Sequence, residues 1–213
     1  MRTSGKDTAI LIDGGFLRKT FEDKFTSPAV AGKCVITHIT VDQVLKNARN
    51  ICDVKRLFRI YYYDASPFDG KRKNPISGKE MDFGSTAGFQ AINQFQNELA
   101  RSNGVAFRKG HLTFKGWKLK ETFDIKNPPK EEDLIPILEQ KTVDIKIGLD
   151  IAWLAIKRIV DRIIIITSDS DFIPVMKFAR KEGLEVVLCS IKGGFRKEML
   201  EHADEFQELN LQK

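Results

Sequence analysis

Cysteine and histidine are both scarce in this sequence of 213 residues, and neither gathers into a metal-binding pattern. The three cysteines, Cys34, Cys52 and Cys189, form no Cys-x-x-Cys pair, which argues against a disulfide framework and against a zinc ribbon. The three histidines stand far apart, at positions 38, 111 and 202. This spacing excludes a zinc hydrolase built on a His-x-x-x-His helix.

The sequence also has no long hydrophobic run and no glycine-rich phosphate loop. No window approaches the roughly 18 uninterrupted apolar residues of a membrane span, and the polar stretch 1–7 has no signal-peptide core. We therefore expect a cytoplasmic protein without a membrane partner. Neither Gly-x-Gly-x-x-Gly nor the Walker pattern occurs, which disfavours a nucleotide-binding Rossmann enzyme.

The overall composition is that of one globular domain. Hydrophobic residues make up 42% of the chain and charged residues 30%, with a net charge of +6. A chain of this length can bury roughly 70% of its unfolded surface, so it needs no disulfide or structural metal to fold. The positive charge is compatible with a polyanionic partner but does not establish one.

Segments with strand and helix patterns alternate along the chain. Short apolar runs predict strands over 8–12, 57–63, 162–166 and 184–188, and helical spacing predicts helices over 16–21, 41–51, 86–101, 143–159, 171–182 and 198–209. The helix over 143–159 is so apolar that we expect it to be buried, and residues 105–120 are typical of one bent strand or a hairpin. We predict a three-layer αβα sandwich with a mainly parallel central sheet, in a single domain 1–213 with insertions or irregular connectors at 23–38, 66–80 and 119–138.

Acidic residues follow two of the predicted strands. Asp13 comes directly after the first strand, and Asp169 and Asp171 come directly after the strand with four consecutive isoleucines. Asp144 lies in the first turn of the helix over 143–159. Because ligands bind at the carboxyl ends of strands in open α/β sheets, these four side chains are expected to converge.

Crowded carboxylates repel one another, and a hard cation removes that repulsion. Mg²⁺ and Mn²⁺ favour oxygen ligands and need no histidine or cysteine, and such a metal can activate water for attack at phosphorus. Each aspartate also has a structural alternative, since Asp13 could form an Asx-turn, Asp171 could cap a helix and Asp144 could complement a helix dipole. Asp150 lies about 240° around the helix from Asp144, so we expect it to point away and to act as a structural or supporting partner.

Two segments are rich in basic residues and could contact nucleic acid. The alternation over 107–120 is typical either of a platform for stacked bases or of an edge strand protected by lysines, with Trp117 in the core. The loop 66–79 is either a flexible phosphate clamp or a solvated loop. The candidate phosphate contacts in the two segments are Lys71, Arg72, Lys73, Arg108, Lys109, Lys115 and Lys118.

Three motifs resemble those of the NYN domain, in its LabA-like branch, within the PIN-like nuclease superfamily. They are Ile-Leu-Ile-Asp-Gly-Gly-Phe at 10–16, Lys-Thr-Val-Asp at 141–144 with Asp150, and Thr-Ser-Asp-Ser-Asp-Phe at 167–172. The resemblance implies a PIN-like fold whose Asp13, Asp144, Asp169 and Asp171 gather Mg²⁺ or Mn²⁺ for phosphodiester cleavage, usually of RNA. Supporting roles would fall to Lys141, Asp150, Ser168 and Ser170. Where the family often has an asparagine three residues after the first aspartate, this chain has Phe16.

The sequence thus predicts a divalent-metal-dependent ribonuclease whose partner is RNA, expected to be single-stranded. Two alternatives remain open at this point: a catalytically weak nucleic-acid-binding or regulatory module, and a metal-dependent phosphoesterase with a small substrate. Assembly into a homo-oligomer is left open.

Overall fold

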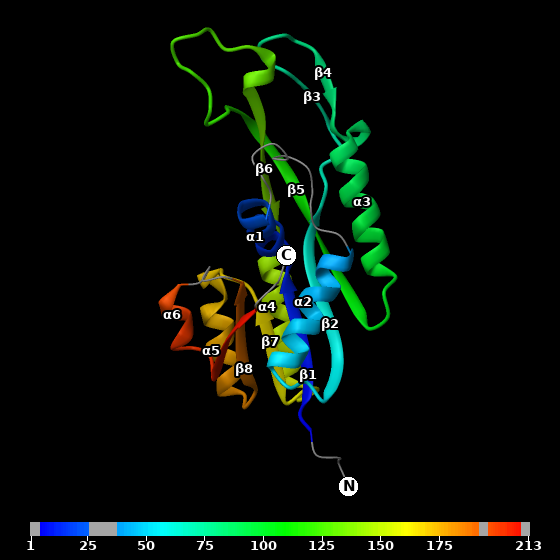
Figure 1. Ribbon diagram of the computed structural model, residues 1–213, viewed down its shortest axis with the longest axis vertical. Coiled ribbons are helices and arrows are strands. Elements are labelled where there is room, and N and C mark those ends of the chain that lie inside the picture. The colour runs from blue at the N-terminus through cyan, green and yellow to red at the C-terminus, as the bar shows by residue number, and fades with distance from the viewer. Residues whose placement is uncertain (1–4, 26–37, 192–195, 210–213) are drawn as a thin grey trace.

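The computed structural model describes residues 5–25, 38–191 and 196–209, and its centre is a seven-stranded sheet (Figure 1). The strands are β1 (Asp7–Asp13), β2 (Arg56–Ser66), β5 (Val105–Leu119), β6 (Leu134–Lys141), β7 (Arg162–Ile166), β8 (Glu185–Ile191) and β9 (Glu205–Leu209). Their order across the sheet is β6-β5-β2-β1-β7-β8-β9, and every neighbouring pair is parallel except β5 with β6. The predicted α/β fold with a mainly parallel sheet is confirmed.

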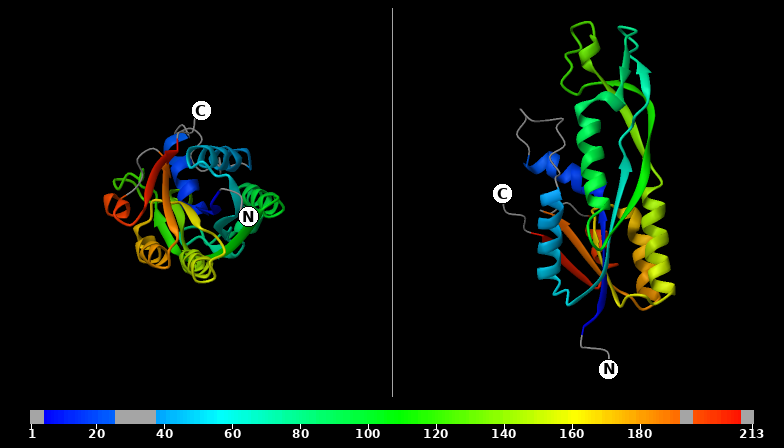
Figure 2. Two further views of the ribbon diagram at one scale, coloured as in Figure 1. Left: turned by 90° about the horizontal axis from the view of Figure 1, so that it is seen from below. Right: turned by 90° about the vertical axis from the view of Figure 1, so that its right-hand side faces the viewer.

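Helices cover both faces of the sheet, as Figure 2 shows. One layer holds α1 (Gly14–Phe25), α2 (His38–Ile51) and α3 (Ala87–Ala100), and the other holds α4 (Val143–Ile156), α5 (Ile173–Lys181) and the short α6 (Lys197–Leu200). Along β1, Ile10 and Ile12 pack into the first layer whereas Ala9 and Leu11 pack into the second. This alternation produces two cores, one on each side of the central strands β1, β7 and β8, which are covered on both faces.

Most helix boundaries follow the sequence signals. Thr86, where the sequence predicted a helix to begin, caps α3 by accepting a hydrogen bond from the backbone N–H of Phe89. Pro174 lies in the first turn of α5, and Gly183, at φ +90°, follows its end. The helix α2 begins at His38, three residues before the start predicted from the helical spacing over 41–51. Most of the connector expected at 23–38 lies outside the described residues.

Part of the chain projects beyond the carboxyl ends of the central strands (Figure 1). We call this projection, residues 67–82 and 112–138, the arm. It contains the antiparallel pairing of β5 with β6 and a small hairpin of β3 (Lys71–Lys73) and β4 (Glu80–Asp82). The segments expected to be irregular at 66–80 and 119–138 therefore contain this hairpin and the start of β6. The expected connector over 119–138 contains Pro136, but β6 is an edge strand, where a proline is tolerated.

The closing helix expected over 198–209 is wrong. Helix α6 ends at Leu200, and residues 205–209 form β9, parallel to β8. The turn is fixed by Asp204, whose carboxylate accepts the backbone N–H of Val186 at 2.8 Å and pairs with Arg180 at 2.9 Å. Because the chain is thereby drawn alongside β8, a segment with helical spacing becomes the outermost strand.

The expectation that the helix over 143–159 is buried is also wrong. The sheet-facing side of α4 is buried, at Val143, Ile147, Ile151 and Leu154. Its outer side is exposed although it is apolar, at Ile145, Leu149, Trp153 and Ile156. A sequence pattern that is apolar all round does not say on how many sides a helix is covered.

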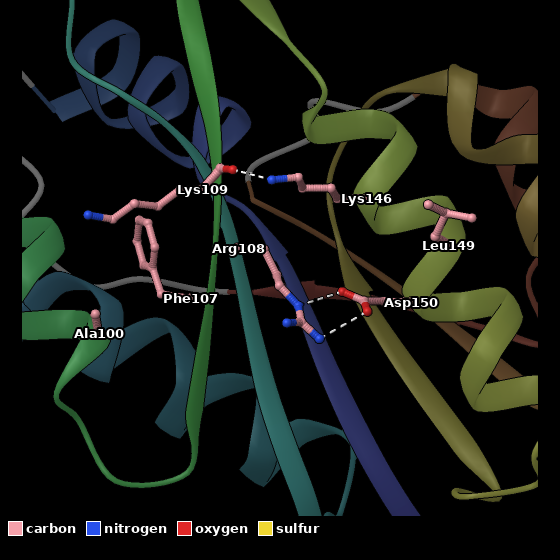
Figure 3. Close-up of a pocket in the computed structure, with 7 residues that line it drawn as sticks. All are labelled: Ala100, Phe107, Arg108, Lys109, Lys146, Leu149 and Asp150. Carbon is pink, nitrogen blue, oxygen red and sulfur yellow. Dashed lines mark hydrogen bonds and ion pairs between the residues drawn. The ribbon is translucent and has the colours of Figure 1, made fainter.

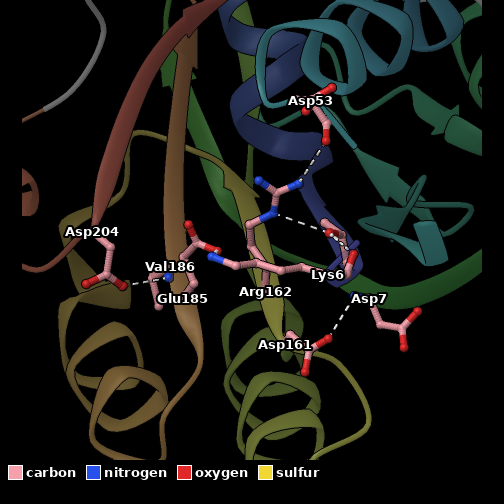
Figure 4. A network of polar contacts seen from close by, with 9 residues as sticks. Lys6, Asp7, Asp53, Asp161, Arg162, Glu185, Val186 and Asp204 are labelled. Carbon is pink, nitrogen blue, oxygen red and sulfur yellow. Dashed lines mark hydrogen bonds and ion pairs between the residues drawn. The ribbon is translucent and has the colours of Figure 1, made fainter. Parts of the chain in front are cut away.

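Polar and charged side chains connect the amino ends of β1, β7 and β8, at the edge of the sheet opposite the arm (Figure 4). The buried Arg162 donates from Nε to the Thr8 hydroxyl at 3.2 Å and from Nη2 to the carbonyl of Asp53 at 3.5 Å. Asp161 accepts the backbone N–H of Asp7 at 2.9 Å. These polar groups at the amino ends of the strands have their partners within the chain. The carboxyl ends of the strands lie at the other edge of the sheet.

Candidate metal centre at the carboxyl ends of the central strands

The strand order reverses beside β1. The chain leaves β1 toward β2 on one side, and returns at β7 on the other side before it continues to β8. Ile12 of β1 pairs with Ile166 of β7, so Asp13 and Thr167 leave the two strands at the same level. A crevice at such a reversal point is where open α/β sheets bind ligands.

A cavity of about 390 Å³ opens at this point. Three of the four predicted carboxylates line it, and they come from the end of β1, the loop after β7 and the first turn of α4. The structure thus brings together segments more than 100 residues apart. The lining residues are Asp13, Gly15, Phe16, Lys19, Gln140, Asp144, Ser168, Asp169, Ser170 and Arg196.

Asp13 is the most deeply placed of these carboxylates. Its Oδ1 accepts the backbone N–H of Phe16 at 3.1 Å, and its Oδ2 accepts the hydroxyl of Thr167 at 3.0 Å. Burial raises the pKa of Asp13 to about 6, the two hydrogen bonds oppose that rise, and the charges of Asp144 and Asp169 add to it. The chain can turn this closely behind β1 because residue 14 is glycine: a Cβ there would lie 2.7 Å from the ring of Tyr62.

Asp169 stands at the cap of a short 3₁₀ turn over Ser170–Phe172 that leads into α5. Its Oδ1 accepts the backbone N–H of Asp171 at 2.9 Å, and its own N–H donates to the Thr167 hydroxyl at 3.1 Å. Asp171 is exposed and does not line the cavity, although its charge acts on Asp144. Capping therefore accounts for one oxygen of Asp169 and leaves the second oxygen for another role.

Asp144 reaches the cavity because β6 runs back toward the sheet and α4 begins directly after it. The corner between them packs against β5 at Gly110, where a Cβ would lie 2.5 Å from Val143 and 2.7 Å from the carbonyl of Lys141. Partial burial, followed by the charges of Asp169 and Asp171, raises the pKa of Asp144. Thr142 occupies the cap position of α4 at φ 69°, but its side chain makes no capping hydrogen bond.

The carboxylates fit a hard cation by their chemistry, and they form an open site. Across 5–25, 38–191 and 196–209, no three histidine, cysteine, aspartate or glutamate side chains stand close enough to enclose a metal ion. Even so, the charges of Asp144 and Asp169 raise the pKa of Asp13, and those of Asp169 and Asp171 raise that of Asp144, so negative charge accumulates with an energetic cost. Mg²⁺ is commonly held by one or two carboxylates plus waters, which suits this arrangement.

Three lining residues were missed by the sequence analysis. Lys19 lies one helical turn after Gly15 on α1, which is a spacing that could have indicated a shared face. Gln140 lies near the end of β6, a strand that the sequence did not predict, and Arg196 precedes α6 in a segment without a recognisable pattern. Lys19 and Arg196 are exposed and add two cations to the lining of an acidic cavity.

Arg108, Lys109 and Asp150 lie at a different cavity, of about 500 Å³, between β5 and α4 (Figure 3). Asp150 accepts two hydrogen bonds from Arg108, at 2.9 and 3.1 Å, and one from the hydroxyl of Tyr63 at 2.9 Å. As expected from its position on the helix, Asp150 points away from Asp144. Arg108 is held by this pair and lies over the ring of Tyr61, and Lys146 donates to the carbonyl of Lys109.

The candidate contacts on the arm have mixed surroundings. Lys71 pairs with Glu80 at 3.6 Å, Lys115 pairs with Glu139 at 3.1 Å, and Arg72 lies over the rings of Phe68 and Phe114. Lys141, expected as a helper, is 2.5 Å from the same Glu139 and does not line the carboxylate cavity. Lys73 and Lys118 are exposed. The arm as a whole carries nine basic and eight acidic residues, so its net charge is small.

The aromatic residues of the arm form a core of their own. Phe114 and Trp117 pack against Phe68 and Phe83 with ring centroids 5.6 to 6.4 Å apart across the group, and the indole N–H of Trp117 donates to the carbonyl of Lys73. This packing favours the core alternative for Trp117 over a platform for stacked bases. It fixes the β3–β4 hairpin against β5.

The fold and the site together define an α/β protein of the PIN-like type, with an acidic crevice at the reversal point of its sheet. The NYN domain profile matches residues 7–210, and the chain belongs to this family, whose members are generally nucleases. The crystal structure of VPA0982, a protein of unknown function from Vibrio parahaemolyticus, has a similar fold, with a TM-score of 0.55, 14% identity, and coverage of 99% of this chain and 96% of that one. No curated protein matches the chain. Among the described helices, none is long and apolar enough to cross a membrane.

Proposed function

We propose that this protein is a Mg²⁺- or Mn²⁺-dependent ribonuclease of the LabA-like branch, cytoplasmic, that hydrolyses phosphodiester bonds of single-stranded RNA. The observation that carries the proposal is the convergence of Asp13, Asp144 and Asp169 in one cavity, where burial and their charges raise the pKa of Asp13 and Asp144. Asp171 acts from the rim, through its charge on Asp144.

A divalent cation bound here would supply a water of lowered pKa and would stabilise charge on the phosphate oxygens. One or two of Asp13, Asp144 and Asp169 would hold it directly, with waters as the remaining ligands. Thr167 keeps Asp13 oriented through its hydrogen bond to Oδ2. Lys19 and Arg196 at the rim attract the phosphate backbone, and the hydroxyls of Ser168 and Ser170 offer donors to the scissile phosphate. No side chain is required as a nucleophile.

Cleavage of labelled RNA tests this function directly. Purified protein is incubated with single-stranded RNA, single-stranded DNA or a phosphomonoester, in Mn²⁺, Mg²⁺ or EDTA. We expect cleavage of RNA that requires metal and that is lost in Asp13→Asn and Asp169→Asn. The matched control is Asp53→Asn, because Asp53 is exposed at the opposite edge of the sheet. Metal-dependent cleavage that survives both cavity substitutions would contradict the proposal.

The second candidate is a nucleic-acid-binding module with weak or no catalysis. It is favoured by the two hydrogen bonds that already engage both oxygens of Asp13, and by the apolar Phe16 in the cavity. This alternative predicts RNA binding that persists in EDTA and in Asp169→Asn, without cleavage under any condition. Turnover of the phosphomonoester alone would instead indicate a small-substrate phosphoesterase.

A further inference from the structure

The outer side of α4 is an apolar surface that nothing in the described part of the chain covers. Ile145, Leu149, Trp153 and Ile156 expose 67%, 65%, 49% and 59% of their surface. We call this set, with Ala152 between its members, the outer α4 face. Leu149 also borders the open cavity between β5 and α4, together with Arg108 and Asp150 (Figure 3), whereas Ile145, Trp153 and Ile156 do not line it.

The spacing on this face is that of a helix that packs against another helix. Ile145, Leu149, Ala152 and Ile156 follow one another at intervals of four, three and four residues, the seam that two helices share when their side chains interlock. The buried residues Ile147, Ile151 and Leu154 form a separate row that faces the sheet. Gly148 borders the seam, and a Cβ there would meet nothing within 4 Å, so there is room for a large side chain from outside.

The area of the face is sufficient for association. The four large side chains expose roughly 500 Å² of apolar surface, at the upper end of what a monomer usually presents as one patch. Two such faces in contact would remove roughly 1,000 Å² from water, the size at which specific interfaces begin.

The shape of the outer α4 face fits a second copy of itself. Trp153 is its bulkiest side chain, and Gly148, five residues earlier, leaves open space beside the seam. When two copies of α4 lie antiparallel, Trp153 of each copy fills the space at Gly148 of the other. The opposed helix dipoles favour the same antiparallel arrangement.

We infer that the outer α4 face is the interface of a symmetric dimer in which α4 packs antiparallel against α4 of a second copy of this chain. With the two-fold axis between residues 150 and 151, Ile145 faces the partner's Ile156 and Leu149 faces the partner's Ala152. Trp153 then lies over the space beside the partner's Gly148. Such a contact is isologous and closes on itself, so it stops at two copies.

Sedimentation velocity of the full chain over a range of concentrations tests the dimer. We expect a dimer fraction that rises with concentration for the unsubstituted chain, and monomer at every concentration for Leu149→Glu and for Ile156→Glu. The matched control is Ile125→Glu, which charges an apolar residue that is 88% exposed on the arm and should leave the dimer intact. A cooperative thermal melt of each exposed-site variant confirms that it folds.

Chemical crosslinking tests the orientation in a Cys34→Ser background, where the other two cysteines, Cys52 and Cys189, are buried. A bismaleimide should join Ile145→Cys chains to Ile156→Cys chains when the two are mixed, and should join neither variant to itself. Self-crosslinking of Ile145→Cys would indicate parallel helices and overturn the arrangement. A chain that stays monomeric, or a dimer unaffected by Leu149→Glu, would overturn the interface altogether.

Discussion

The hydroxyl of Thr167 donates a 3.0 Å hydrogen bond to Oδ2 of Asp13, and the oxygen of this hydroxyl accepts the backbone N–H of Asp169 at 3.1 Å. One buried side chain therefore connects the ends of β1 and β7 and sets the position of two carboxylates at once. The Thr167 hydroxyl holds Asp169, in the loop after β7, close to Asp13 at the end of β1. It also means that the electrostatics of Asp13 can be altered from a neighbouring strand.

Asp13→Asn should stabilise the metal-free protein at neutral pH. The pKa of Asp13 is about 6 in the folded state against 3.8 as the ordinary value, so the folded state gains from this group below pH 3.8 and loses that gain as pH rises through 6. Holding the ionised carboxylate at pH 7 costs about 3 kcal/mol, which asparagine avoids in large part. Thermal melts in EDTA from pH 4 to 8 measure this effect. The melting temperature of Asp13→Asn, relative to that of the unsubstituted chain, should increase up to about pH 7 and then stay constant.

Other carboxylates also titrate in this pH range, so the melting temperature of each variant is compared with that of the unsubstituted chain at the same pH. Asp53→Asn, in its exposed position, should follow the unsubstituted chain at each pH. A melting temperature of Asp13→Asn equal to or below that of the unsubstituted chain at pH 7 would contradict the burial of a costly charge at this position.

Thr167→Val should raise the pKa of Asp13 further. The hydroxyl bond favours the ionised carboxylate, and valine has a similar shape but cannot donate. Metal ligands must be deprotonated, so Mn²⁺ binding weakens as the pH falls. In Thr167→Val this loss of binding should occur at a higher pH. The rise in melting temperature with Mn²⁺, measured at each pH, reports the binding. Thr167→Ser keeps the hydroxyl and should restore the original pH dependence of Mn²⁺ binding. The same pH dependence in all three proteins would mean that the hydrogen bond does not act on Asp13.

Sequence reasoning was sufficient for the parts of this fold whose signals are local. Four consecutive isoleucines make β7 a buried strand whatever its neighbours, and Thr86 caps α3 through contacts within one turn. The positions of Asp13 and Asp169 followed in turn, because the carboxyl ends of parallel strands share one edge of a sheet.

The parts that were missed depend on distant contacts. β9 has a helical pattern, and it is a strand only because Asp204 binds the backbone of Val186 and draws the chain along β8. β6 carries a proline, and it is a strand because the far half of β5 needs a partner. Gln140 and Arg196 could not be assigned to the cavity for the same reason, since their place depends on elements that no local pattern specifies.

Lys19→Ala and Arg196→Ala should weaken RNA binding more than substitutions on the arm. Both cations line the acidic cavity, whereas Lys71 and Lys115 on the arm are already paired with glutamates. Each lost phosphate contact should lower the slope of log affinity against log salt by about 1. Fluorescence anisotropy with labelled RNA at several salt concentrations measures the slopes, and Lys71→Ala is the control. A larger change in slope for Lys71→Ala than for Lys19→Ala would shift the binding surface to the arm.

Asp150→Ala should destabilise the fold and leave the metal centre intact. The substitution removes a bidentate pair with Arg108 and the hydrogen bond from Tyr63, and because Arg108 is about 41% exposed we expect a loss of roughly 1–2 kcal/mol in the free energy of unfolding. Asp150 lines the cavity between β5 and α4, not the one that holds Asp13. The rise in melting temperature with Mn²⁺ should therefore equal that of the unsubstituted chain.

A double-mutant cycle separates the pair from other effects of the change. Arg108→Ala and Asp150→Ala should each be destabilising, and the double variant should cost less than their sum, since the two side chains share one interaction. Additive losses would mean that the two side chains stabilise the protein independently. Loss of the Mn²⁺ response in Asp150→Ala, with a cooperative melt retained, would instead assign this residue to the metal centre and place the functional site on both sides of α4.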